Sequence, residues 1–369
     1  GETWDILNEE IPGTGPDDYS ELGADSYTFA EPRNGVIAFF VANLWCDAFI
    51  MKSTDHGDTW EKVMVWEHPY PFYDDNTVFT DTLWAPDNSG HIALDSEGKA
   101  HVVFGLGFII KTEVGSTYTH YPGYQDGIVY WNEDMDPFEN AEPHDALDPY
   151  DVLEENVNLI GWSQDVDGNG ELDFTDDIIS YSEIGLSTMP NIAVDEQNRI
   201  YVVWASTTEG FDNGVNNYKH VWGRSAIDPE MGWSEFHDLT GALIHIFDEC
   251  VYPQLVSLTD DNIYMMYNVD ASPGNAVDGD HDYQQNKQVW ATINKDEILA
   301  IDDQEVFTTD MVSQSYPNPC SESAVVQVEL NKAANLSLEL LNLMGQQVLA
   351  IPAKKVNAGT HHLTLDVDG

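Results

Sequence analysis

Residues 191–204 read NIAVDEQNRIYVVW, which is two short runs of β-branched and aromatic residues joined by a polar turn. Alternation with a period of two, bounded by Asp and Asn, predicts the two antiparallel strands of a hairpin. Three further segments share this layout: YTFAEPRNGVIAFF from residue 27, HIALDSEGKAHVVF from residue 91 and QLVSLTDDNIYMMY from residue 254. The chain is therefore expected to consist of repeated β-hairpins.

A third strand with a recurring appearance follows each hairpin, as AFIMKSTD, GIVYWNED, HVWGRSAID or QVWATINKD, and in places a fourth follows, as in TWEKVMVWEHP. The hairpins begin at residues 27, 91, 191 and 254, and the long middle interval holds roughly 36 extra residues. Units of four antiparallel strands predict an all-β β-propeller over residues 1–303, because each blade must bury its faces against neighbours. We count four blades, with five or six possible. ETWDILNEEI, at 2–11, is expected to complete the last blade.

The composition limits the partners that this chain can bind. Its 369 residues include 66 acidic and 13 basic side chains, a net charge of −53, and 42 % of the residues are hydrophobic. That apolar content suffices for a packed core, while the charge opposes binding to nucleic acid or anionic membrane and favours cations. The most apolar run, GVIAFFVANLW, is too short to span a bilayer. The three cysteines imply no disulfide framework, although Cys46 and Cys250 could pair.

The segment STDHGDTW carries Ser53, Asp55, Gly57, Thr59 and Trp60. It resembles the Asp-box, or BNR repeat, of sialidase-like propellers. Side chains of this type cap the backbone N–H groups of a tight turn, and glycine permits a positive φ. We expect a structural role here, with the tryptophan packed between blades.

The segment DVDGNGELDFTD, at 165–176, has the spacing of an EF-hand-type calcium loop. Oxygen-bearing groups fall at positions 1, 3, 5, 7, 9 and 12, namely Asp165, Asp167, Asn169, Glu171, Asp173 and Asp176. Calcium prefers six to eight oxygen ligands, with glycine at position six for the sharp turn. Leu172 is expected to anchor the loop to a core. The sequence predicts a structural calcium ion that pins an insertion of about 145–185 against the propeller.

Two other interpretations of this loop stay open. Asp and Asn also populate solvated turns that bind nothing. The stretch resembles a dockerin-type loop, which implies a cohesin partner, although dockerins usually carry two such loops and only one is visible. The aspartate at position twelve, where a bidentate glutamate is commonest, is expected to weaken calcium binding.

The tail differs from the rest of the chain. Residues 304–314 are expected to form a polar linker, and 315–369 alternate cleanly, which predicts a small Ig-like antiparallel β-sandwich. SYPNP, LLNLMGQQV and NAGTHHLTLDV occur there in this order. The segment resembles the C-terminal sorting domain of the type IX secretion system of Bacteroidota. That resemblance implies contact with the secretion machinery, followed by release or attachment at the cell surface. The absent leader suits a processed form. The family usually continues with a further strand, which is expected to be missing, processed or not included in this sequence.

Three carboxylates are weak catalytic candidates. Asp47, Glu209 and Asp270 follow the second strands, so we expect them at one end of the propeller axis, where two carboxylates at a suitable separation could act as acid and base.

A sialidase would need three arginines that converge on a carboxylate. Of Arg33, Arg199 and Arg224, the first two are expected in outer hairpin turns away from the axis. A true sialidase is therefore excluded, and an enzyme of any kind is not favoured.

The sequence thus predicts a secreted or cell-surface calcium-binding β-propeller with a recognition, adhesion or structural role. Its partner would be a glycan or a surface protein. The alternatives are an extracellular glycoside hydrolase that acts on polysaccharide and a self-assembling surface or filament subunit.

Overall fold

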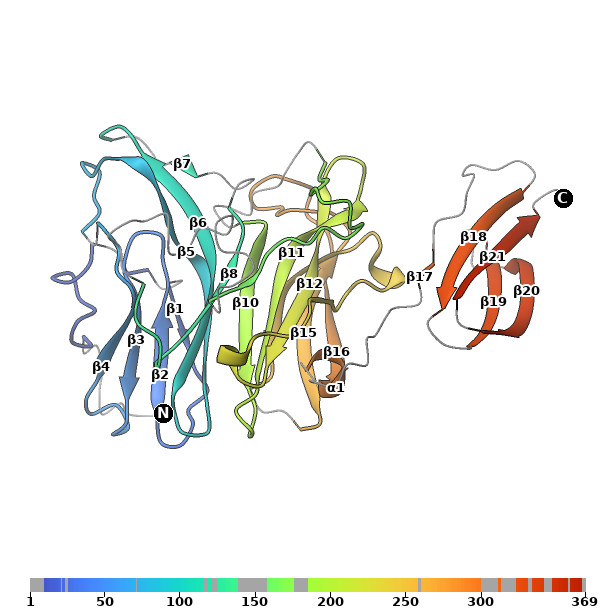
Figure 1. The fold of residues 1–369 in the computed structure, drawn as a ribbon. Helices are drawn as coiled ribbons and strands as arrows, with labels where there is room; N and C mark the ends of the chain where they lie inside the picture. The colour runs from blue at the N-terminus through green and yellow to red at the C-terminus, as the bar shows by residue number, and fades with distance from the viewer. Residues whose placement is uncertain are drawn as a thin grey trace. The chain divides into compact units, whose positions relative to one another are not determined.

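The structure is a computed structural model. It comprises two compact units, 1–301 and 302–369 (Figure 1). The described residues are 10–20, 22–23, 26–70, 72–115, 119–120, 125–138, 158–175, 185–257, 260–299, 311–312, 323–330, 334–341, 347–357 and 359–366. No helix in this part of the chain is both long enough and apolar enough to cross a membrane.

The first unit contains four antiparallel sheets, each built from neighbouring segments in the order that the hairpins predict. The first sheet consists of β1 (Tyr27–Phe29), β2 (Ile37–Val41), β3 (Ala48–Ser53) and β4 (Glu61–Trp66). The second consists of β5 (Phe79–Leu94), β6 (Ala100–Lys111), β7 (Thr119–His120), β8 (Ile128–Asn132) and β9 (Leu159–Gly161). The third consists of β10 (Ser187–Val194), β11 (Ile200–Asp212), β12 (Asn217–Ala226) and β13 (His237–Asp238). The fourth consists of β14 (Glu249–Leu255), β15 (Asn262–Asp270) and β16 (Lys287–Asn294).

Helix is sparse. Two 3-10 turns, η2 (Pro229–Met231) and η3 (Leu243–His245), and one helical turn, α1 (Lys295–Ile298), complete the described elements of this unit.

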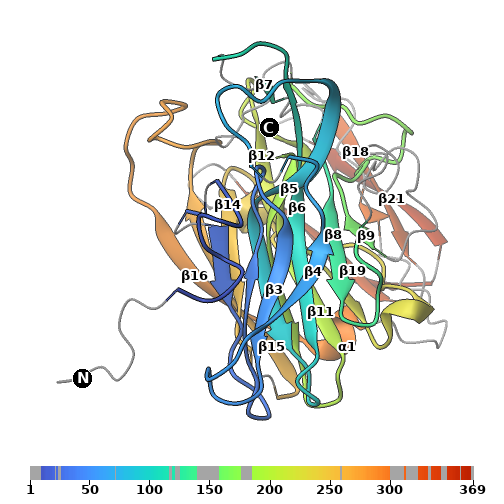
Figure 2. The same ribbon diagram turned by 90° about the vertical axis from the view of Figure 1, so that its left-hand side faces the viewer.

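The sheets pack face to face and form the four-bladed β-propeller arrangement that the repeats predict. Between the first and second sheets lie Phe40, Phe104 and Trp131, and between the second and third lie Tyr130 and Trp204. Another apolar cluster joins the third and fourth sheets. Figure 2 shows the long strands of these sheets running in similar directions. Burial of apolar surface between sheets is the main stabilising contribution, since no sheet can shield both of its faces alone.

One detail of the second sheet differs from the prediction, whereas the number of blades agrees with it. Its fourth strand, β9, comes from inside the stretch 145–185 that was expected to be an insertion, and pairs with β8. The other described strands of 108–190 before the third sheet, β7 and β8, also join this sheet, so the described residues form no fifth blade there. Because a three-residue strand is too short to show alternation, β9 was not predicted as a strand.

The outer face of the fourth sheet is open among the described residues. Met265 and Tyr267 on β15 are buried against the third sheet, whereas Met266 and Trp290 on the opposite face are 39 % and 58 % exposed. The segment expected to complete this blade, 2–11, lies outside the described residues except for its last two.

The first sheet is only partly covered on its outer flank. Tyr19 stacks on Phe49 with 5.3 Å between the ring centroids, while Phe29 on β1 is 60 % exposed. Cys46 and Cys250 are buried as free thiols and do not pair. Trp60 packs against Phe39 on this flank, 5.5 Å between centroids, rather than between two blades as predicted.

The second unit is a small β-sandwich, as predicted. One sheet has the order β17 (Met311–Val312), β18 (Ser323–Leu330) and β21 (Gly359–Asp366), and the other pairs β19 (Ala334–Leu341) with β20 (Gln347–Val356). Both sheets contribute apolar side chains to one core, with Val326 and Leu365 from the first sheet and Leu338 and Leu349 from the second. Residues 311–312 therefore belong to the sandwich and not to the expected linker. SYPNP lies outside the described residues, as do parts of the other two motifs.

Candidate functional site

The acidic loop follows β9 and is described up to residue 175. Asp165 organises its first turn, because one carboxylate oxygen accepts the N–H of Gly168 at 2.7 Å and the other accepts that of Gly170 at 2.7 Å. The hydrogen bond from Gly170 is the main reason that the pKa of Asp165 lies below its usual value. The carboxylate is therefore ionised at neutral pH and already held in place.

The middle of the loop is a network of side-chain amide and carboxylate groups. The Asn169 side-chain amide donates to Asp167 at 3.1 Å and to Asp173 at 3.0 Å, and its carbonyl oxygen accepts the N–H of Glu171 at 2.8 Å. Four of the six predicted ligand residues are thus bonded around one turn. Glu171 contributes through its backbone, and Asp176 lies outside the described residues.

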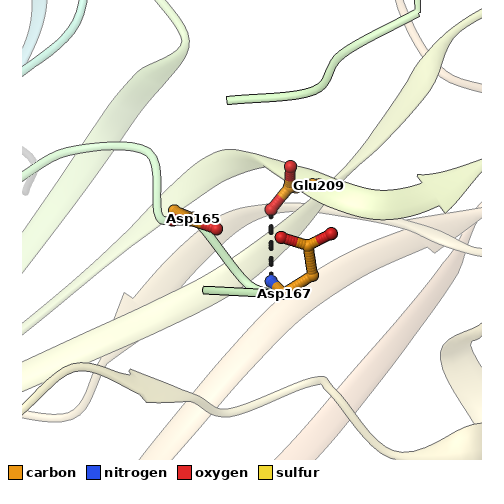
Figure 3. A group of neighbouring side chains, drawn as sticks. All are labelled: Asp165, Asp167 and Glu209. Atoms are coloured by element: carbon orange, nitrogen blue, oxygen red, sulfur yellow. Dashed lines mark hydrogen bonds between the residues drawn. The ribbon is translucent and has the colours of Figure 1, made fainter. Parts of the chain in front are cut away.

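A glutamate from a distant strand holds the loop against the third sheet. Glu209, on β11, accepts the N–H of Val166 at 2.6 Å with one oxygen and the N–H of Asp173 at 2.8 Å with the other. A longer bond, 3.3 Å, comes from the N–H of Asp167 and is drawn in Figure 3. Only 4 % of Glu209 is exposed, so this carboxylate is held in a fixed position.

Three carboxylates meet at this point. One oxygen each of Asp165, Asp167 and Glu209 lie within 4.8 Å of one another (Figure 3). Like charges at such separations repel, and a hard divalent cation that binds oxygen ligands would relieve that repulsion. The loop itself adds Asn169 and Asp173, which are donors of the same chemistry. The residues present therefore fit a calcium ion.

The structure corrects the predicted anchor of this loop. Leu172, expected to pack into a core, is 44 % exposed. Glu209 performs that task, with a second tie from Thr175, whose N–H donates to Asn217 at 2.8 Å. Glu209 was one of three weak catalytic candidates, expected at one end of the propeller axis. Its separation from the loop, more than thirty residues along the chain, leaves no local signal that could have paired them.

The other two catalytic candidates are used locally. Asp47 accepts the hydroxyl of Tyr19 at 2.8 Å and the N–H of His68 at 2.7 Å. Asp270 accepts the N–H of Ser272 and the side-chain amide of Gln284, each at 3.0 Å. Among the described residues, neither belongs to the acidic group around Glu209.

Asp47 has an equivalent in the second sheet, which explains its role. Asp126 precedes β8 as Asp47 precedes β3, and Asp126 accepts the N–H of Ser163 at 2.9 Å. His68 and Ser163 each lie two residues after the fourth strand of their sheet. The two aspartates therefore fasten the exit of the fourth strand to the entry of the third.

The sequence placed Arg33 in an outer hairpin turn away from the axis. The structure instead brings its side chain to the second and third sheets. Its guanidinium donates to the carbonyl oxygens of Leu94 at 3.1 Å, Val194 at 2.9 Å and Asp195 at 3.2 Å. One side chain of the first sheet thus binds the second and third sheets. These carbonyl partners occupy its donors, which is the chemistry of a structural tie and not of a carboxylate clamp.

Comparisons with known proteins add little beyond the fold. No family model and no curated protein matches this chain. Among solved structures, the chain is similar to a polysaccharide lyase of family PL25, an ulvan lyase, with 11 % identity and a TM-score of 0.39. The match covers 91 % of this chain and 66 % of the lyase.

Two further solved structures are similar at the same level. A GH43 endo-arabinanase from Bacillus licheniformis shares 11 % identity over 92 % of both chains, with a TM-score of 0.32. A protein of unknown function from Dyadobacter fermentans shares 10 % identity, with a TM-score of 0.35, over 93 % of this chain and 83 % of that one. None of these similarities assigns an activity to this chain.

Proposed function

We propose that this chain is a secreted, calcium-binding β-propeller that recognises a glycan at a bacterial cell surface. The observation that carries the calcium part is the convergence of Asp165 and Asp167 with buried Glu209. A ligand set divided between a loop and a strand of the core couples cation binding to the packing of the third blade.

Recognition is favoured over catalysis by the use to which the candidate carboxylates are put. Asp47 closes its own sheet, Glu209 fastens the loop, and Asp270 caps the turn that follows β15. All three carboxylates hold backbone N–H groups, and this use accounts for their positions through the fold alone.

Export by the type IX route is the second part of the proposal. It is supported by the order of the three tail motifs and by the independent core of the second unit. The full chain and a chain that ends at residue 301 would be expressed in a bacterium with a working type IX system. Surface protease would degrade the full chain, and the shorter one would stay protected in the periplasm. Equal exposure of both would contradict export through the tail.

Calorimetric titration with Ca²⁺ tests the metal part. We expect a dissociation constant of about 10⁻⁴–10⁻³ M, the range of extracellular modules. At a calcium concentration of about 100 times that constant, the free energy of unfolding should rise by about 2.7 kcal/mol. The double variant Asp165→Asn/Asp167→Asn should lose both effects.

The matched control for this titration is Asp282→Asn, which removes one exposed carboxylate outside the loop. It should bind calcium as the native chain does. Equal loss in the control would mean that calcium responds only to the net charge of −53. Measurable release of reducing ends from a polysaccharide by the native chain would replace recognition by hydrolysis.

A further inference from the structure

A cavity of about 240 Å³ lies where the first strands of all four sheets meet. It is lined by apolar residues of β5, β10 and β14 and by polar and aromatic groups, which are Phe29, Glu31, Arg33, His91 and Ser257. These residues lie near the turns between first and second strands. Because second strands run antiparallel to first strands, the cavity is at the end of the blades opposite Asp47, Glu209 and Asp270.

The wall of this cavity is rigid. Arg33 holds carbonyl oxygens of the second and third sheets, and the side chain of Asn191 on β10 bonds β14 through Gln254 at 3.2 Å and the N–H of Leu255 at 3.0 Å. All four sheets are therefore fixed around the same space. A preformed cavity costs little conformational entropy when a ligand binds.

His91 lines this space as a neutral imidazole. Burial lowers the pKa of His91 to about 4, so its imidazole is uncharged at neutral pH. Its Nδ1 accepts the N–H of Ile192 at 3.5 Å, which places the ring proton on Nε2. The ring is fixed in place because β5 and β10 pack against each other.

The remaining groups combine one exposed ring with two oxygen acceptors. Phe29 is 60 % exposed, Glu31 is an exposed carboxylate, and Ser257 offers a hydroxyl. A sugar ring presents a face of C–H groups, which stacks on an aromatic ring, and an edge of hydroxyls, which bond to carboxylates, hydroxyls and imidazole. At about 240 Å³, the cavity is smaller than the roughly 300–1,000 Å³ of sites for drug-sized ligands, which favours one such ring over an extended chain.

Charge selects among sugars. The chain carries −53 overall, and Glu31 adds a carboxylate at the cavity itself. Arg33 pairs with Glu196 at 3.4 Å, so its positive charge is balanced there and the carboxylate of Glu31 remains as the charge at the cavity. A uronate or sulfated sugar would be repelled, and a neutral sugar would not.

We propose that this cavity binds one neutral sugar residue at the end of an oligosaccharide. The inference rests on the proposed function of glycan recognition and adds the site and the class of ligand.

The test is a printed array of neutral and uronate-containing oligosaccharides, probed with the native chain and with single variants in the presence of calcium. Phe29→Ala and His91→Leu should each weaken binding to the neutral glycans at least tenfold. Glu31→Gln, an exposed change that leaves the core intact, should weaken it several-fold. Phe247→Ala is the matched control, because Phe247 is 65 % exposed and does not line the cavity; its binding should equal that of the native chain.

Three results would overturn the inference, and they separate it from the proposed function. Binding of neutral glycans that survives Phe29→Ala and Glu31→Gln would remove the cavity and leave glycan recognition in place. Preferred binding of uronate-containing glycans would contradict the charge argument. A native chain that binds calcium but no glycan on the array would remove both the cavity and glycan recognition.

Discussion

The turn 53–60 and the loop 165–173 are each organised by an aspartate near the start of the segment, but only the loop is contacted by a carboxylate from a distant strand. In the turn, Asp55 accepts the N–H and the hydroxyl of Thr59 at 2.9 and 2.6 Å and the hydroxyl of Ser53 at 2.8 Å. In the loop, Asp165 accepts backbone N–H groups in a similar manner, but Glu209 arrives from β11 and brings the carboxylates together. Local spacing therefore shapes both turns, and only the distant glutamate turns one of them into a candidate metal centre.

A third acidic turn, which follows β10, gives the largest expected effect of a substitution on stability. Asp195 on the third sheet is fully buried at its side chain and bonds Lys295 of α1 at 2.9 Å and Arg199 at 2.7 Å. Asp195→Ala leaves the buried lysine without its carboxylate, which should lower the free energy of unfolding by about 3–5 kcal/mol in urea.

The second sheet provides the control for that measurement. Asp95 occupies the equivalent turn and bonds the N–H groups of Glu97 and Lys99, but its nearest cationic candidate is His101, whose pKa burial lowers. Asp95→Ala should cost less than half as much. Adding Lys295→Met to Asp195→Ala should recover part of the loss, and equal stability of single and double variants would show that the pair is not coupled.

Replacement of Glu209 tests directly whether this distant glutamate makes the loop a metal centre. Glu209→Gln keeps the length of the side chain and removes one charge from the centre of the cluster. The calcium dissociation constant should rise about 100-fold, because a ligand and an orienting hydrogen-bond acceptor are lost together. Calorimetric titration measures the change. An unchanged constant would show that Glu209 only fastens the loop.

Asp87 is a carboxylate buried away from solvent and, among the described residues, not paired with a cation. It tests how burial alone affects the protonation of a carboxylate. It is fully buried, and desolvation raises its pKa to about 6, against hydrogen bonds from Ser89 that lower it. The folded chain therefore holds this proton more tightly than the unfolded chain. Its contribution to stability is fully present below a pH of about 4 and is lost as the pH rises through about 6.

Between pH 4.5 and 7, the native chain should lose about 2 kcal/mol of unfolding free energy relative to Asp87→Asn, measured in urea. Asparagine mimics the protonated acid and does not titrate, so the other groups cancel in the difference. Parallel pH profiles for the two chains would show that Asp87 is ionised throughout.

The smallest expected effect comes from replacing the corresponding aspartate in each segment, Asp165 in the loop and Asp55 in the turn 53–60. Asp165→Asn should weaken calcium binding about tenfold, since one charged ligand becomes neutral. Asp55→Asn should leave calcium binding unchanged and lower the midpoint of thermal unfolding equally with and without calcium. A calcium response that depends on Asp55 would mean that acidity alone, and not the convergence at Glu209, governs cation binding.

The elements of the fold were predictable wherever the signal is local. Period-two alternation located the hairpins of all four sheets, and the spacing from Asp165 to Asp173 located the loop. The strand β9 escaped because it has only three residues, and it lies in the stretch expected to be an insertion.

Side-chain direction across the fold was not predictable in the same way. Arg33 reaches carbonyl oxygens more than 60 residues away, and Glu209 bonds a loop from which some 40 residues separate it. Such pairings depend on which blades become neighbours, and no alternation or motif encodes that. The role of Asp47 is not encoded locally either, because a carboxylate that serves a backbone N–H has the same sequence signature as one that serves a substrate.

The two buried thiols lie in different blades, so the reactivity of each one reports on the opening of its own blade. Burial raises the pKa of Cys46, beside β3, to about 12 and also raises that of Cys250, on β14. Neither is reactive as thiolate while its blade is closed. Alkylation followed by mass spectrometry would therefore time the exposure of the first and the last blade separately, and would show which of the two opens first.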